Sequence, residues 1–227
     1  MTDINLIDFL SELVTEERLD TFMKVLNNRT RYITVVLEDL FQSHNASAVL
    51  RSCDCFGIQD VHMIENKFSY SLNRDVSLGS AQWLSLFRYN KKENNTLDAI
   101  KELKKQGYRI VATTPHTNDT VLEDLDLNRG KIALLFGSEL PGLSDIAMEN
   151  ADEFVKINMR GFTESFNISV SAAICLYELT KKLRTSSIEW GLSDEEEKKL
   201  LLEWLRISIK DSDNIIKLYY QRIKNNV

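Results

Sequence analysis

Polar and glycine residues gather in three short stretches of the chain, at residues 45–51, 137–144 and 161–169. Each stretch comes after a run of apolar residues that predicts a strand. Amide, guanidinium and carboxylate side chains can hold a hydroxyl or a phosphate, and glycine lets the backbone approach a ligand closely. Because open parallel sheets place their ligands at the carboxyl ends of strands, the three stretches predict one ligand site.

Each stretch also has an interpretation that involves no ligand. Asn45 is predicted to cap a helix over residues 45–56, with Arg51 projecting from the second turn as a surface or ion-paired residue. Ser144 is predicted to cap the helix that follows the second stretch. Ser165 and Asn167 stand where a third helix opens, so ordinary capping also accounts for them. No single stretch decides between capping and ligand binding.

Strands and helices alternate through the middle of the chain. Strands are predicted at 32–37, 60–64, 84–89, 108–113, 131–136 and from Phe154, and helices at 45–56 and 96–105. A short helix is also expected within 71–84, and Gly107 is expected to close the helix before it in left-handed backbone. This alternation predicts an α/β fold with a mostly parallel sheet covered by helices on both faces.

The two ends of the chain are predicted to be helical. Amphipathic patterns indicate one or two helices over 4–27, and further helices at 194–210 and 213–224. Ser193 and Glu196 have the spacing of a capping box. The predicted division is an N-terminal extension (1–30), a central domain (31–184) and a C-terminal extension (185–227). The chain carries a net charge of -6 but is mildly basic from residue 181 onward, which fits either a solvated helical face or contact with a polyanion.

Composition argues against several classes of protein. No apolar run is as long as a membrane span, and the acidic N-terminus lacks a signal-peptide pattern, so a cytoplasmic protein without a membrane partner is expected. The three cysteines are expected to be buried thiols, and the three histidines have no metal-binding spacing. No metal site is predicted.

Taken together, the three stretches resemble the signature motifs of the SpoU (TrmH) family of SPOUT methyltransferases. The matching patterns are Asn-x5-Arg from Asn45, Phe-Gly-x-Glu-x-x-Gly-Leu-Ser from Phe136, and Ser-x-Asn-x-Ser-x-x-x-Ala from Ser165. Their order and their positions after strands also match, and the resemblance extends from about Tyr32 to Leu183. The resemblance implies 2′-O-methylation of an RNA ribose, a C-terminal trefoil knot, and a homodimer whose active site draws on both subunits.

The resemblance also implies roles for individual residues. S-adenosyl-L-methionine would be the methyl donor and S-adenosyl-L-homocysteine the product. The residues implied in cofactor binding are Thr113, Gly137, Ile157, Met159, Ser165 and Phe166. Those implied in catalysis are Arg51, Asn45, Glu139 and Asn167. The sequence departs from the family pattern at Asn158, where proline is usual, and at Phe166, where leucine is usual.

Two chemical roles for Arg51 fit the reaction. It would act on the ribose 2′-hydroxyl, either as the base that removes its proton or as a clamp that binds a phosphate and orients the hydroxyl. A free guanidinium is effectively always protonated, which makes the role of base chemically demanding.

Within the family, the run 44–54 and the helical ends resemble the tRNA enzymes that methylate guanosine 18 in the D-loop. The residues implied in tRNA binding are Arg29, Arg31, His44, Lys181, Lys182 and Arg184. Two other functions remain open on the sequence alone. One is the same chemistry on ribosomal RNA or at another tRNA position, and the other is a catalytically silent RNA-binding dimer.

Overall fold

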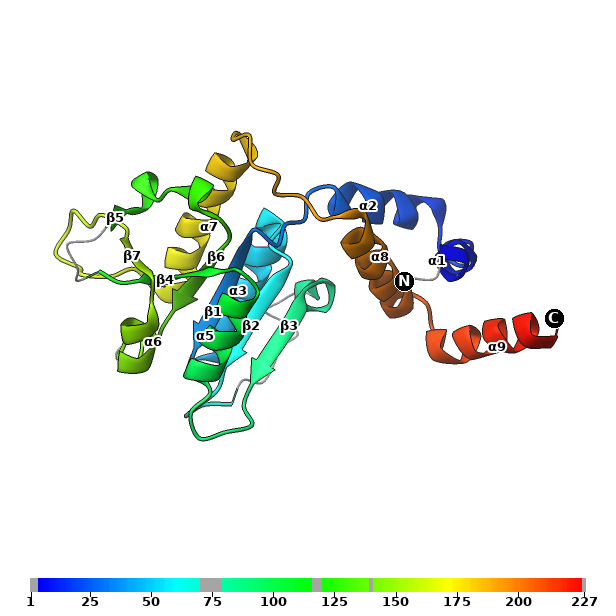
Figure 1. The fold of residues 1–227 in the computed structure, drawn as a ribbon, viewed down its shortest axis with the longest axis horizontal. Helices are drawn as coiled ribbons and strands as arrows, with labels where there is room; N and C mark the ends of the chain where they lie inside the picture. The colour runs from blue at the N-terminus through cyan, green and yellow to red at the C-terminus, as the bar shows by residue number, and fades with distance from the viewer. Residues whose placement is uncertain (1–3, 70–78, 116–119, 139–140, 226–227) are drawn as a thin grey trace. The chain divides into compact units, whose positions relative to one another are not determined.

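The computed structural model describes residues 4–69, 79–115, 120–138 and 141–225 of the chain. The chain divides into two compact units, Thr30–Trp190 and a helical unit made of Met1–Arg29 with Gly191–Val227 (Figure 1). No helix in the described part of the chain is long and apolar enough to cross a membrane. The predicted division into residues 1–30, 31–184 and 185–227 stays a prediction.

The unit Thr30–Trp190 is built on one sheet. Among the described residues the sheet has seven strands in the order β3-β2-β1-β6-β4-β7-β5, and each pairing between neighbours is parallel. The strands are β1 (Ile33–Glu38), β2 (Asp60–Ile64), β3 (Ser85–Tyr89), β4 (Arg109–Thr113), β5 (Thr120–Val121), β6 (Ile132–Phe136) and β7 (Glu153–Lys156). The predicted parallel α/β sheet is confirmed, whereas the trefoil knot stays a prediction.

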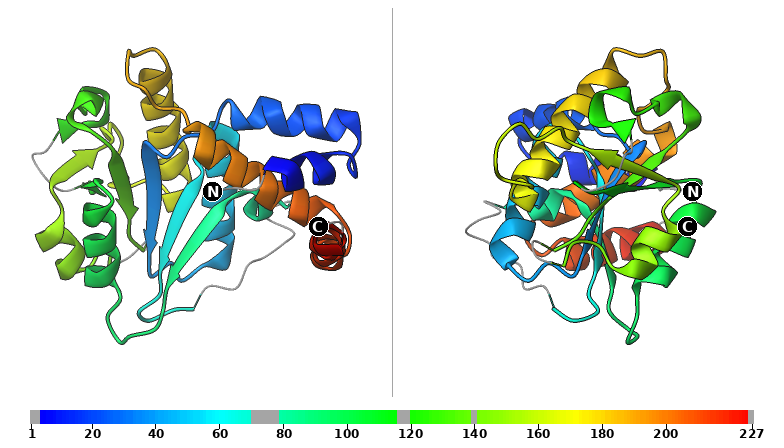
Figure 2. Two further views of the ribbon diagram at one scale, coloured as in Figure 1. Left: turned by 45° about the vertical axis from the view of Figure 1, so that its right-hand side comes forward. Right: turned by 90° about the vertical axis from the view of Figure 1, so that its left-hand side faces the viewer.

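Helices cover both faces of this sheet, as the sequence predicted (Figures 1 and 2). Helices α3 (Ser43–Phe56) and α7 (Ile168–Arg184) pack on one face, in a core that includes Val35, Leu134 and Leu176. Helices α5 (Thr96–Lys105) and α6 (Asp145–Asn150) pack on the other, around Val36 and Leu135. Successive residues of a strand point to opposite faces, so the central strands are mostly apolar because both faces are buried.

Local signals set the ends of these elements. The predicted helix 96–105 is confirmed, and Gly107 beyond it has φ 86°, the left-handed backbone expected there. The two ends of the unit meet where Thr30 Oγ1 donates to the carbonyl of Trp190 at 2.6 Å. A short helix was predicted within residues 71–84; of these, 71–78 lie outside the described residues, and Ser80–Trp83 form a 3₁₀ turn. The 3₁₀ turns η1 (Ser80–Trp83), η2 (Leu122–Asp124) and η3 (Leu127–Arg129) complete the unit.

The helical unit joins both ends of the chain. It consists of α1 (Ile4–Ser11), α2 (Glu16–Leu26), α8 (Asp194–Ser208) and α9 (Ser212–Asn225). The capping box of Ser193 and Glu196 is confirmed at the start of α8. Trp204 is buried on α8 and packs against Phe22, with ring centroids 5.7 Å apart. This aromatic centre explains why segments from opposite ends of the sequence fold together.

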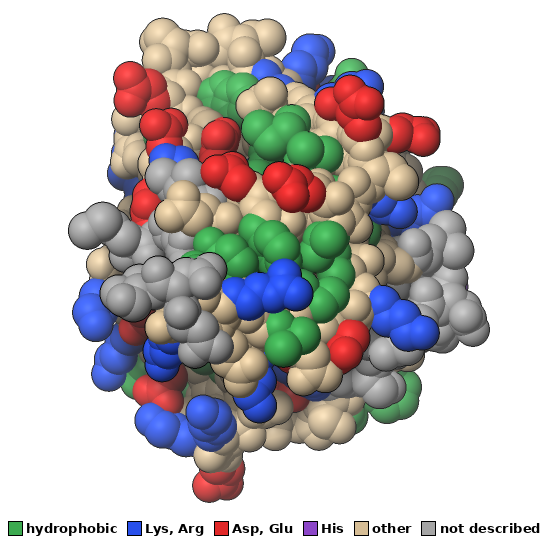
Figure 3. Space-filling model, turned by 90° about the vertical axis from the view of Figure 1, so that its right-hand side faces the viewer, with side chains coloured by type: hydrophobic (Ala, Val, Ile, Leu, Met, Phe, Trp, Pro, Cys, Tyr) green, Lys and Arg blue, Asp and Glu red, His purple; other side chains and the backbone are tan. Residues whose placement is uncertain are grey.

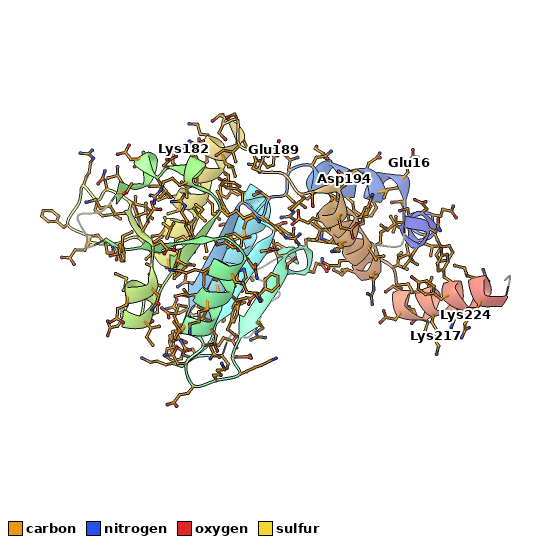
Figure 4. All side chains as sticks on the ribbon, in the orientation of Figure 1. Glu16, Lys182, Glu189, Asp194, Lys217 and Lys224 are labelled. Atoms are coloured by element: carbon orange, nitrogen blue, oxygen red, sulfur yellow. The ribbon has the colours of Figure 1, made fainter. Side chains whose placement is uncertain are left out.

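The surface mixes charged and apolar side chains. On the face drawn in Figure 3, hydrophobic side chains lie exposed between acidic and basic ones. On α9, Leu218, Tyr220 and Ile223 are exposed, and Lys217 and Lys224 project from the same helix (Figure 4). The acidic net charge is therefore spread over a surface that also carries basic residues.

Candidate functional site

A cleft opens between the chain segments that follow β4, β6 and β7. It consists of two adjoining hollows that share Thr113, Thr114, Ser165, Phe166 and Ser171 among their lining residues. All the residues predicted to bind a cofactor line one or both hollows, namely Thr113, Gly137, Ile157, Met159, Ser165 and Phe166. We call this hollow surface the cofactor cleft. Its position at the carboxyl ends of parallel strands is the usual place for a ligand in an open α/β sheet.

The loop after β6 closes one side of the cofactor cleft through its own backbone. Ser138 and Gly142 exchange two backbone hydrogen bonds, of 3.1 and 3.0 Å. A Cβ atom on Gly137 would lie 2.2 Å from the carbonyl carbon of Gly142 and 2.3 Å from the nitrogen of Leu143, and Gly142 has φ 70°. Glycine is therefore required sterically at residue 137 and favoured by backbone conformation at residue 142.

Glu38 anchors the end of the same loop, a role that the sequence did not predict. Its carboxylate is buried and accepts hydrogen bonds from Ser144 Oγ at 2.7 Å and from the Ser144 backbone nitrogen at 2.8 Å. Thr96 Oγ1 donates to the same carboxylate at 2.5 Å. Ser144 Oγ in turn accepts from Ala147, which confirms the predicted cap of α6. The sequence did contain a signal for this role, which is a charged residue at the end of an apolar strand. A carboxylate buried there requires several hydrogen-bond donors, and Ser144 and Thr96 provide them.

One cysteine contributes to the wall of the cofactor cleft. Burial raises the pKa of the Cys175 thiol to about 12, so the group is a neutral thiol at physiological pH and a poor nucleophile. Cys53 is also buried, whereas Cys55 is exposed on α3, so the prediction of three buried thiols is wrong for Cys55.

Among the described residues no cluster of His, Cys, Asp or Glu is arranged to hold a metal ion.

Two of the predicted catalytic residues meet at the start of α7. Asn167 Nδ2 donates to Asn45 Oδ1 at 3.2 Å, which joins motifs 122 residues apart in the sequence. Asn167 also caps α7, because its Oδ1 accepts from the Ser169 backbone nitrogen at 2.9 Å. The prediction that Asn45 caps α3 is wrong: the helix begins at Ser43, and the amide of Asn45 bonds instead to Gln42 and Asn167.

Of the other two predicted catalytic residues the structure describes only Arg51, which makes no hydrogen bond to this pair. Arg51 is exposed on α3, and no hydrogen bond or ion pair joins its guanidinium to another residue that the structure describes. It is absent from the lining of the cofactor cleft. Glu139 lies outside the described residues. The described residues therefore join the amides of Asn45 and Asn167, while Arg51 lies exposed on α3.

Most of the basic residues predicted to bind RNA lie near the ends of α3 and α7. Lys181 and Arg184 are exposed in the last turn of α7, and His44 is exposed in the first turn of α3. Lys182 Nζ donates to the carbonyls of Glu123 and Leu125, so it also holds η2 against α7 (Figure 4). The charges on α7 stand where the helix dipole favours cations.

The arginines near β1 differ from this group in their surroundings. Arg31 is partly buried and pairs with Asp60 at 3.0 Å. Arg29 belongs to the helical unit, where it is 1 % exposed and its guanidinium lies 5.4 Å from the ring centroid of Trp204. A phosphate would have to displace this packing to reach Arg29, so Arg29 is not among the RNA contacts that we propose.

Comparisons with known proteins agree with the geometry. Residues 32–177 match the model of the SpoU rRNA Methylase family. The tRNA (guanosine(18)-2′-O)-methyltransferase of Borreliella burgdorferi is 46% identical over 219 residues, which cover 96% of this chain and 94% of that protein. The enzyme of the same name from Thermus thermophilus is 31% identical over 194 residues, covering 85% and 97% of the two chains.

A solved structure shows the same fold. The crystal structure of the A. aeolicus TrmH/SpoU tRNA modifying enzyme superposes with a TM-score of 0.76 at 29% sequence identity. The superposition covers 86% of this chain and 98% of that chain. The similarity therefore includes nearly all of the known protein.

Proposed function

The chain belongs to the SpoU rRNA Methylase family, and we propose that it transfers a methyl group from S-adenosyl-L-methionine to the 2′-hydroxyl of a ribose in tRNA. We further propose guanosine 18 as the nucleotide, because the Borreliella and Thermus relatives, which match most of this chain, carry that position in their names. The product of the cofactor would be S-adenosyl-L-homocysteine.

The observation that carries the proposal is the composition of the cofactor cleft. Every residue that the motif resemblance assigned to the cofactor lines this cleft, although those residues come from separate parts of the sequence. The lining combines hydroxyl groups, such as those of Thr113 and Ser165, with apolar surfaces such as Ile157 and Phe166. A nucleoside with an amino-acid tail presents the same mixture of polar and apolar surface, so the residues present fit the methyl donor.

Bound S-adenosyl-L-methionine would supply a methyl group activated by a positively charged sulfur. The residues of the chain would then have two tasks, which are to hold the ribose hydroxyl in line with that methyl group and to exclude other nucleophiles. The neutral thiol of Cys175 suits the second task, because a thiolate in the wall of the cleft would compete for the methyl group.

For the first task we propose Arg51, Asn45, Asn167 and Glu139 as the catalytic residues. Asn45 and Asn167 would position the ribose through their joined amides. Arg51 would bind a phosphate next to the target and orient the 2′-hydroxyl, because a guanidinium keeps its proton and donates hydrogen bonds in a fixed plane. The hydroxyl proton would pass to a phosphate oxygen or to water as the oxygen–carbon bond forms.

We propose that the active enzyme is a homodimer in which Arg51 of one chain serves the cofactor cleft of the other. Support comes from the exposed surface of α3 and α7, where a hollow is lined by small and apolar side chains that include Ala48, Ala173 and Tyr177. Val170 and Tyr177 are 44% and 57% exposed on this surface. Small residues allow a second helix to approach closely, and Arg51 on α3 lies next in sequence to Ser52, which lines the same hollow.

The basic residues Lys181, Lys182, Arg184, Arg31 and His44 are proposed to contact the phosphates of tRNA. The central domain 31–184 would carry out methyl transfer, and the helical segments 1–30 and 185–227 would be extensions that add surface for the RNA. The proposed location is the cytoplasm.

Methyl transfer from labelled S-adenosyl-L-methionine to a tRNA transcript tests this proposal. Wild-type protein should label a transcript with guanosine at position 18 and leave unlabelled a matched transcript whose nucleotide 18 is 2′-deoxyguanosine. Equal labelling of the two transcripts would exclude that 2′-hydroxyl as the acceptor, and no labelling of either would exclude tRNA methylation at this position.

A further inference from the structure

An apolar hollow adjoins the cofactor cleft. It has a volume of about 420 Å³ and shares Ser138, Pro141 and Ile168 with the lining of the cofactor cleft. Asn45 also lines it, so the hollow reaches one of the amides proposed to hold the ribose. Its size is within the range of pockets that hold small ligands.

Two phenylalanine rings form the outer part of this hollow. Phe41 is 71% exposed and Phe68 is 39% exposed, and their ring centroids lie 5.0 Å apart at an interplanar angle of 74°. Exposed aromatic rings cost free energy in water and are seldom kept side by side without a partner. The edge-to-face arrangement leaves aromatic surface open to a flat ligand.

Asp39 holds these two rings in place. Its carboxylate accepts hydrogen bonds from the backbone nitrogens of Asn66 at 2.7 Å and Lys67 at 2.9 Å. These bonds tie the loop after β1, which carries Phe41, to the loop after β2, which carries Phe68. Asp39 itself has φ 49°, a left-handed conformation that costs free energy for a residue other than glycine. Strained backbone conformations of this kind are often found at ligand-binding sites, where they fix the positions of the side chains that contact the ligand.

We propose that Phe41 and Phe68 form a stacking site for the base of the nucleotide being methylated. The inference rests on the proposed function, since it assigns the base of the same RNA target. Proteins hold unpaired bases by stacking them on aromatic side chains, and these rings offer such a surface. A base in this hollow lies next to the wall shared with the cofactor cleft, and its ribose then reaches Asn45. Lys67, which also lines the hollow, suits an adjacent phosphate.

A substrate lacking the base tests this inference. Two tRNA transcripts would be compared, one with guanosine at position 18 and one with an abasic ribose there, which keeps the 2′-hydroxyl. For the wild-type enzyme, removing the base should lower kcat/KM about 10- to 100-fold. For the double variant Phe41→Ala/Phe68→Ala, kcat/KM on the intact transcript should be low by a similar factor, and removing the base should lower it little further.

Three controls establish whether the effect belongs to these two rings. Phe87→Ala removes a ring of similar exposure, 42%, from the edge strand β3 and should leave the sensitivity to the base unchanged. Phe41→Tyr keeps an aromatic ring and should keep most of the activity. Affinity for S-adenosyl-L-methionine should be unaltered in every variant. The single variant Phe41→Ala, which alters the more exposed ring, repeats the test with the least change to packing.

The possible failures are distinct. If the wild-type enzyme methylates tRNA and the double variant is equally active, or equally sensitive to loss of the base, the stacking site is disproved while the proposed function stands. If the wild-type enzyme does not methylate the intact transcript, the proposed function fails and this inference fails with it. Loss of dimerisation in the double variant would assign the two rings to a second copy of the chain instead.

Discussion

The cofactor cleft and the outer surface of α3 differ in how complete they are within one chain. The cleft is lined by both hydroxyl and apolar side chains of one chain, and its loop after β6 is fixed by the Ser138–Gly142 pair and the buried Glu38. On α3, Arg51 is exposed and bonded to no residue that the structure describes. The difference fits the proposal that one chain forms the cofactor cleft, whereas Arg51 acts together with the RNA and a second chain.

The largest expected effect is a loss of catalytic activity, with no change in cofactor affinity, when Arg51 is replaced. Arg51→Ala should lower kcat by about 10²- to 10⁴-fold, since it removes the group that we propose orients the hydroxyl. Calorimetric affinity for S-adenosyl-L-methionine should not change, because Arg51 does not line the cofactor cleft. Unchanged activity in this variant would contradict the role of Arg51.

The variant Arg51→Lys distinguishes the two roles proposed for this residue. A pH–rate profile parallel to that of the wild type supports a clamp, whereas a new ionisation in the profile supports a base.

Replacing Gly137 is expected to have the opposite effect, which is loss of cofactor binding. Gly137→Val should weaken binding of S-adenosyl-L-methionine about 100-fold, because its Cβ would overlap the backbone at Gly142 and force the loop to move. Gly191→Val is a matched control, since a Cβ there meets nothing within 4 Å. Equal affinity of wild type and Gly137→Val would show that the loop after β6 is not part of the cofactor site.

Coexpression of Arg51→Ala and Gly137→Val chains tests whether the two regions come from different chains. Each variant alone should be inactive, but a mixed dimer combines an intact cofactor cleft from one chain with Arg51 from the other. With random assortment, activity should return to about a quarter of the wild-type value. No recovery in mixed dimers that are shown to form would mean that Arg51 acts on its own chain.

A smaller effect is expected from the basic residues at the end of α7. Replacing Lys181, Lys182 and Arg184 by Ala should weaken tRNA binding and reduce the slope of log affinity against log salt by about one for each phosphate that is no longer neutralised. Lys101→Ala/Lys105→Ala on α5 is a control with exposed lysines on the other sheet face. The melting temperature should be measured too, because Lys182 also bonds to backbone carbonyls. Unaltered tRNA affinity in the triple variant would exclude these residues as RNA ligands.

The smallest expected effect concerns the stability of the fold and involves His62 on β2. Burial lowers the pKa of this histidine from 6.5 to about 4. Between these pH values the unfolded chain binds a proton that the folded chain does not, so stability is lost as the pH falls from 6.5 towards 4. The loss is at most about 3 kcal/mol. His62→Phe, which keeps an aromatic ring beside Phe87, should lose less stability over this range in denaturant titrations. Equal losses would contradict the buried neutral histidine.

Much of the fold followed from local patterns in the sequence. The β-branched run at 32–37 and the Gly107 stop signal predicted β1 and the end of α5 closely. The strand order did not follow, because the placement of β7 between β4 and β5 depends on tertiary pairing that no local pattern contains. The cofactor residues were named by motif, while their gathering into one cleft became visible only in the structure.

Other features depend on contacts between distant residues. Arg29 looked like an RNA contact because it is basic and precedes β1, but its cation–π contact with Trp204 involves a residue 175 positions later in the chain. No local pattern singles out Phe41 and Phe68, because their rings meet through contacts between two loops, including the bonds of Asp39 to Asn66 and Lys67. Such pairs become visible only when the fold is known.

The central claim is 2′-O-methylation of guanosine 18 in tRNA, and mapping of ribose methylation in total RNA tests it most directly. RNA from a strain that lacks this protein would be compared with RNA from the parent strain and from a strain restored with the wild-type or the Arg51→Ala chain. We predict that the 2′-O-methyl group at position 18 of tRNA disappears in the deletion and returns only with the wild-type chain. Loss at a ribosomal position instead, or an unchanged tRNA, would contradict this claim.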